Sequence, residues 1–186
     1  MNYNPYYKFI DFFKRHNLYN ERVFRYIREN STLFDYREEE YRSYISTVPV
    51  IGKDKRLKAV KLIVPHIGDD KTILINIHEY IHALLFYNKL GKYFEIGPEI
   101  EILPLFYERL YILENPTEEL IKYKEFLDNI IIEENREEYI IALNSQEELH
   151  KYFTEGNTNI ESLEKKSKKL SKKYKKEYSS SNKNKS

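Results

Sequence analysis

The chain has 186 residues, 41% of them hydrophobic, with 18 Tyr, 10 Phe and no Cys. This length suits one domain with a real core, the lack of Cys excludes disulfides and thiolate metal sites, and no apolar run approaches the roughly 18 residues of a membrane span. The net charge of +1 conceals an acidic body and a basic end, because residues 151–186 hold 11 Lys against 4 Glu. We therefore expect a cytoplasmic protein with a domain over residues 1–155 and a Lys-rich, helical or disordered tail over residues 156–186.

The N-terminal part of the chain combines helical and extended patterns. Apolar residues recur at helical spacing over residues 5–16 and in two further stretches up to Tyr41. Between Tyr44 and Pro65, β-branched residues flank the charged segment KDKR, which predicts a β-hairpin. The run from Lys71 to Leu90 contains no Gly or Pro and predicts a central helix, with its N-cap near Gly68 and its C-cap at Gly91.

The C-terminal part is expected to be helical. One helical stretch opens at Gly97-Pro98 and is broken or kinked at Pro104. A long helix should run from Thr117 to about Asn144, and a capping-box pattern at Ser145 indicates a short helix after it. The predicted fold class is therefore mainly α (α+β), with the small β-hairpin placed before the central helix. The tail is so poor in apolar residues that its removal should leave folding almost unchanged.

The segment His78-Glu79-Tyr80-Ile81-His82 lies within the predicted central helix. Residues four apart occupy the same face of a helix, so the two imidazoles can bind one ion at about 2 Å from each nitrogen. Glu79 is rotated away by one position, where its carboxylate can take a proton from a bound water and deliver it to a leaving amine. This His-Glu-x-x-His pattern is the known zincin signature and predicts Zn²⁺ as the cofactor.

A catalytic zinc ion of this class needs a third protein ligand. The next helical stretch offers Glu99, Glu101 and Glu108. Glu101 is the preferred ligand, because 18 residues separate it from His82, a separation that occurs in zincins. Glu108 lies about two turns further on the same face and is expected to accept a hydrogen bond from the outer nitrogen of a ligating histidine. A kink at Pro104 would bring Glu99 or Glu108 to the metal in place of Glu101.

The block HEYIHALL followed by EIEILPLFYE resembles the thimet-oligopeptidase-like family of metallopeptidases over about residues 75–112. The resemblance implies a zincin-like helical domain of the gluzincin type. It implies zinc ligation by His78, His82 and Glu101, a general base at Glu79 and a supporting carboxylate at Glu108. The His-Glu-x-x-His helix alone also resembles the short zincins associated with phage-repressor regulation.

The function expected from these residues is peptide-bond hydrolysis by a zinc-bound water that Glu79 activates, with a peptide or protein as substrate. His150, Tyr152 and Tyr139 are candidates for stabilising the oxyanion, but a core or surface role suits each better and the role is left unassigned. The alternative is a non-catalytic, degenerate zincin that acts as an interaction protein, with a basic tail that binds nucleic acid or an acidic partner. No membrane partner is expected.

Overall fold

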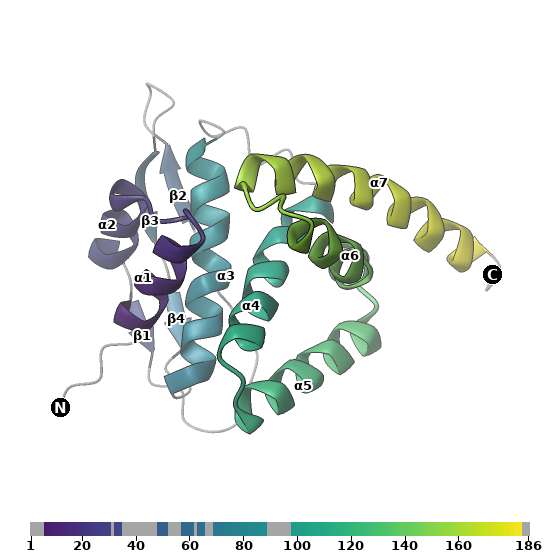
Figure 1. The fold of residues 1–186 in the computed structure, drawn as a ribbon, viewed down its shortest axis with the longest axis horizontal. Coiled ribbons are helices and arrows are strands. Elements are labelled where there is room, and N and C mark those ends of the chain that lie inside the picture. The colour runs from purple at the N-terminus through teal and green to yellow at the C-terminus, as the bar shows by residue number, and fades with distance from the viewer. Residues whose placement is uncertain are drawn as a thin grey trace. The chain divides into compact units, whose positions relative to one another are not determined.

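A computed structural model describes residues 6–30, 32–34, 48–51, 57–61, 63–65, 69–88 and 98–183 (Figure 1). The chain forms two compact units, unit 1 from Met1 to Glu95 and unit 2 from Ile96 to Ser186. The described residues are mainly helical, which confirms the predicted class. None of the described helices has both the length and the apolar content that crossing a bilayer requires.

Unit 1 contains three helices and four short strands among its described residues: α1 (Tyr6–Arg15), α2 (Glu21–Asn30), β1 (Thr32–Phe34), β2 (Val48–Ile51), β3 (Leu57–Lys61), β4 (Ile63–Pro65) and α3 (Asp69–Asn88). Strand β1 pairs in parallel with β4, and β2 pairs antiparallel with β3. Residues 52–56, between β2 and β3, lie outside the described residues, so the predicted hairpin stays a prediction. Helix α3 packs against α1, α2 and β4.

Helix α3 is the predicted central helix, and its surface is buried almost all round. From Ile73 to Leu85 every side chain is buried except those of His78 and His82, which are half-buried. A helix that is apolar on all sides is typical of a protein core rather than of a solvent-facing layer. The two predicted capping glycines, Gly68 and Gly91, lie outside the described residues.

Unit 2 is helical throughout its described residues. It contains the short 3₁₀ helix η2 (Pro98–Ile100) and the helices α4 (Ile102–Glu114), α5 (Glu118–Glu134), α6 (Glu137–Thr154) and α7 (Ile160–Lys183). Helix α6 packs against all the others, with its largest contacts to α4 and α7. The buried residues Ile141, Ala142, Ser145, Gln146 and Leu149 form the face of α6 that makes these contacts.

The sequence predicted a break in the helical stretch at Pro104. The structure has this break three residues earlier, at Glu101, between η2 and α4. Pro104 is the third residue of α4, and the first backbone hydrogen bond of that helix runs from Leu105 N–H to Glu101 O at 3.1 Å. The first-turn N–H groups of a helix have no intrahelical partner, so a residue without an N–H costs nothing there. Pro104 therefore belongs to the start of a helix and does not kink one.

The predicted long helix from Thr117 to Asn144 is two helices. Asn135 ends α5 in the left-handed conformation, with φ 49° and ψ 36°, which Asn adopts more readily than most residues. Helix α6 then runs through Ser145, so the predicted capping box there is wrong. The hydroxyl of Ser145 is buried and donates to Ile141 O at 2.7 Å, within the helix.

The Lys-rich segment forms helix α7, which packs on α6 (Figure 1). Leu163 and Leu170 are 0% and 2% exposed, and the small residues Ser167 and Ser171 are buried as well. The expectation that this segment contributes little core is therefore wrong. Leu163 and Leu170 are seven positions apart, so they fall on one side of the helix and are buried together.

Glu148 of α6 connects the two helices through its charge. It pairs with Lys166 and Lys173 of α7, at 3.8 and 2.5 Å, and accepts a hydrogen bond from the hydroxyl of Tyr174 at 2.8 Å. The hydrogen bond from Lys173, followed by that from Tyr174, holds the pKa of Glu148 below its ordinary value. Helix α7 is thus attached by a narrow apolar seam with ion pairs beside it.

We expect Leu170→Ala to destabilise the protein by about 2–5 kcal/mol, the usual cost of truncating a fully buried leucine. Thermal denaturation followed by circular dichroism measures the change. Lys169→Ala is the matched control, because Lys169 is its exposed neighbour on the same helix and surface changes usually stay within about 0.5 kcal/mol. Equal melting temperatures for Leu170→Ala and the unmodified protein would show that α7 is not part of the core.

Candidate metal centre

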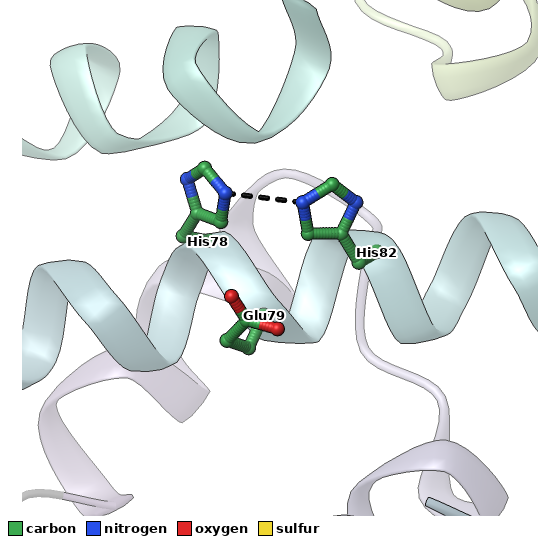
Figure 2. A group of neighbouring side chains, drawn as sticks. All are labelled: His78, Glu79 and His82. Carbon is green, nitrogen blue, oxygen red and sulfur yellow. Dashed lines mark hydrogen bonds between the residues drawn. The ribbon is translucent and has the colours of Figure 1, made fainter. Parts of the chain in front are cut away.

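His78 and His82 lie one turn apart on α3 and direct the same ring atom toward each other (Figure 2). Their Nε2 atoms are 3.0 Å apart, and the ring planes meet at 66°. Two nitrogens bound tetrahedrally to one zinc ion, each at about 2.0–2.1 Å, lie about 3.3 Å from each other. The observed separation is therefore a few tenths of an ångström shorter than that of two nitrogens bound to one zinc ion.

Glu79 completes a group that could hold a metal ion. One ligand atom from each of His78, Glu79 and His82 lies within 4.8 Å of the others. In Figure 2 the Glu79 side chain leaves the helix on a different side from the two imidazoles. This is the placement that the sequence predicts for a carboxylate one position away from the first histidine.

The three residues differ in their exposure to solvent. Glu79 is 6% exposed, whereas both histidines are half-buried. Burial therefore removes Glu79 from most of the solvent, and the two histidines only in part. The imidazoles are the most exposed side chains between Ile73 and Leu85, so an ion approaches that stretch of α3 most easily at this point.

Tyr80, inside the motif, fastens this turn of α3 to the segment between α1 and α2. Its hydroxyl donates to Leu18 O and accepts from Asn20 N–H, both at 2.8 Å. Its ring stacks on Phe13 with centroids 4.0 Å apart. Burial raises the pKa of Tyr80, so the hydroxyl stays protonated and able to donate. The sequence did not identify this role, because the partners lie about 60 residues away and no local pattern marks them.

The three glutamates proposed from the sequence all lie in unit 2. Glu99 is in η2, Glu101 precedes the first residue of α4 as its N-cap, and Glu108 is in the middle of α4. Glu108 is buried, at 8% exposed, and Glu101 and Glu99 are half-buried. Glu108 is seven positions after Glu101, so they share one side of α4 as expected. Their pairing with the histidines of unit 1 stays a prediction.

Tyr123 of α5 is a neighbour of Glu108 that the sequence did not identify. Burial raises the pKa of Tyr123 to about 12, and the negative charge of Glu108 adds to the shift. The Tyr123 hydroxyl therefore stays protonated next to the Glu108 carboxylate. Nothing in the sequence distinguishes Tyr123 from the other 17 tyrosines.

The remaining sequence candidates lie in unit 2 and have ordinary structural contacts. The Tyr152 hydroxyl shares a hydrogen bond of 2.8 Å with Ser162 Oγ, and the Tyr139 ring lies 4.7 Å from the guanidinium of Arg136. His150 is half-buried on α6. These contacts agree with the core or surface role that was preferred for each residue.

No protein-family model, curated protein sequence or solved structure matches the chain.

We expect Tyr80→Phe to destabilise the protein by about 1–3 kcal/mol, because it leaves the Leu18 carbonyl and the Asn20 N–H without their buried partner. Urea denaturation measures the loss. Tyr87→Phe is the control on the same helix, since its hydroxyl accepts only an exposed hydrogen bond of 3.3 Å from Arg22. Equal losses for the two variants would mean that the Tyr80 hydroxyl does not hold α3 in place.

Proposed function

We propose that the chain is a zinc-dependent metallopeptidase. The observation that carries the proposal is the His78–His82 pair, with Nε2 atoms 3.0 Å apart on a helix that is otherwise buried over that stretch. One ring can donate an N–H to the other across this distance, and a metal ion can take the place of that shared proton and bind both nitrogens. Glu79 next to the pair supports hydrolysis rather than metal storage, because a structural site needs no general base.

Zinc is the proposed ion because the donor set contains imidazole and carboxylate groups, and the chain has no Cys. Bound zinc would polarise a peptide carbonyl and lower the pKa of water. Glu79 would accept a proton from that water and later donate it to the amine of the leaving peptide.

Glu101 is the proposed third ligand, and Glu108 is proposed to orient one of the histidines. About 10 Å of helix axis separates these two residues, which favours different roles for them over joint ligation. Two neutral imidazoles and one carboxylate leave the zinc site with a net charge of +1, so the ion keeps its Lewis acidity. The second buried carboxylate, Glu108, would accept the outer N–H of a ligating imidazole.

Metal content and turnover separate the peptidase from its rival, a non-catalytic interaction protein. We expect about one zinc ion per chain by elemental analysis of protein purified without added metal. His78→Ala and His82→Ala should lose the metal, whereas the control His150→Ala should keep it, because His150 lies outside the cluster. No zinc, and no uptake on titration, would contradict the proposed site.

Glu79→Gln tests the chemistry apart from the metal. Glutamine keeps the shape of the side chain but cannot accept a proton, so we expect the variant to retain fold and zinc and lose nearly all turnover of a peptide library. An adaptor protein would tolerate the change without functional loss. Retained turnover would exclude Glu79 as the general base.

Zinc titration of Glu99→Ala, Glu101→Ala and Glu108→Ala identifies the third ligand. Glu101→Ala should lose metal binding, because it removes both a ligand and the compensating charge. Glu108→Ala should bind zinc at saturating concentration with affinity or activity reduced about 10- to 100-fold, and Glu99→Ala should have the smallest effect. If Glu108→Ala abolishes binding and Glu101→Ala binds normally, the two roles are exchanged.

A further inference from the structure

Four lysines of α7 form a straight line on one side of the helix. Lys165, Lys169, Lys172 and Lys176, here called the lysine row, follow one another at intervals of four, three and four residues. Residues at these intervals are neighbours on one helical face, with Cβ atoms about 5–6 Å apart. The row spans about 16 Å along the axis. All four side chains are exposed.

The lysine row differs from the other lysines of α7 in its electrostatic partners. Lys166 and Lys173 pair with Glu148, Lys168 pairs with Glu164, and Lys175 approaches Glu137 at 3.9 Å. None of the four row lysines makes an ion pair with a residue that the structure describes. The paired lysines attach α7 to α6 or stabilise the helix, whereas the row has no such structural role.

Unit 2 has a basic C-terminal helix and an acidic remainder. Residues 160–183 hold nine Lys and three Glu, whereas residues 96–159 hold five basic and 15 acidic side chains. The inner lysines of α7 are neutralised by the acidic body through Glu148 and Glu137. The positive potential that remains is therefore concentrated along the lysine row.

We propose that the lysine row binds the phosphate backbone of double-stranded nucleic acid. A line of exposed ammonium groups is complementary in charge to a duplex, which carries one negative charge per about 1.7 Å of axis. Point contacts from lysine to phosphate position a protein without reading sequence. The binding is therefore expected to be independent of sequence.

The chemistry of α7 argues against two other polyanions. A helix that binds membranes presents apolar side chains beside its cations, but Leu163 and Leu170 are buried and no large hydrophobic side chain of α7 is exposed among the described residues. A single-stranded nucleic acid is usually held by stacking on free aromatic rings. Tyr174 and Tyr178 are instead held by Glu148 and by the Asn135 carbonyl, at 2.8 and 2.9 Å.

The number of lysines sets the strength and salt dependence of the complex. Each neutralised phosphate contributes about −0.9 to the slope of log K against log salt, so four contacts give a slope of at most about −3.6. Affinity should resemble ordinary sequence-independent binding, with Kd of about 10⁻⁴ to 10⁻⁶ M at physiological salt.

Fluorescence anisotropy with a labelled DNA duplex of about 20 base pairs, at about 50 mM salt, tests the proposal on the full chain. The variant carrying Lys165→Gln, Lys169→Gln, Lys172→Gln and Lys176→Gln should bind at least about 10-fold more weakly and with a smaller salt slope. The control carries Lys166→Gln, Lys168→Gln, Lys173→Gln and Lys175→Gln, which changes the net charge equally on the same helix. It should bind the duplex nearly as the unmodified protein does. Circular dichroism checks that both variants remain folded.

Several results would overturn the proposal. One is the absence of duplex binding by the unmodified protein at low salt. Another is an equal loss of duplex affinity in the two variants. The third is tighter binding to phosphatidylserine vesicles or to polyglutamate than to the duplex. The test does not involve the metal, so its outcome is independent of the proposed peptidase function.

Discussion

The burial of α3 is the constraint on which the described part of unit 1 depends. A helix enclosed on nearly all sides must satisfy each polar group that it carries, because an unpaired polar group in an apolar environment costs free energy. Tyr80 meets this requirement by bonding to the backbone of residues 18 and 20. His78 and His82 lie where the enclosure is incomplete. The same packing that stabilises the helix thus restricts solvent and ions to the one turn where the imidazoles lie.

Features governed by local geometry could be predicted from the sequence. The position of α3 follows from a run without Gly or Pro, and the proximity of His78 and His82 follows from a spacing of four residues on a helix. The break at Asn135 was missed because Asn also occurs within helices, and charged helix formers surround it on both sides. The partners of Tyr80 are distant in sequence, so no local pattern could reveal them.

Helix α7 shows why the composition of the C-terminal segment led to a wrong prediction of its contribution to the core. The average apolar content of the segment is low, but burial depends on where the apolar residues fall. Leu163 and Leu170 lie on one side, and the small serines 167 and 171 beside them let α6 approach closely. The same register separates the lysines into those that pair with α6 and those of the lysine row. A count of charges predicts a uniformly basic tail. In the helix, the lysines instead lie on two faces, one that pairs with α6 and one that carries the lysine row.

The hydrogen bonds of Tyr80 also restrict how α3 can move as a rigid body. Aliphatic contacts are non-directional, so they fix the position of a helix along and about its axis less sharply than directional bonds do. Hydrogen bonds depend steeply on distance and angle, and Tyr80 makes two of them to a turn outside the helix. Because Tyr80 is adjacent to Glu79 in the chain, a roll or slide that displaced the imidazoles would first have to break both bonds. Any displacement of the turn at residues 18–20 would, conversely, be transmitted to the orientation of the histidine pair.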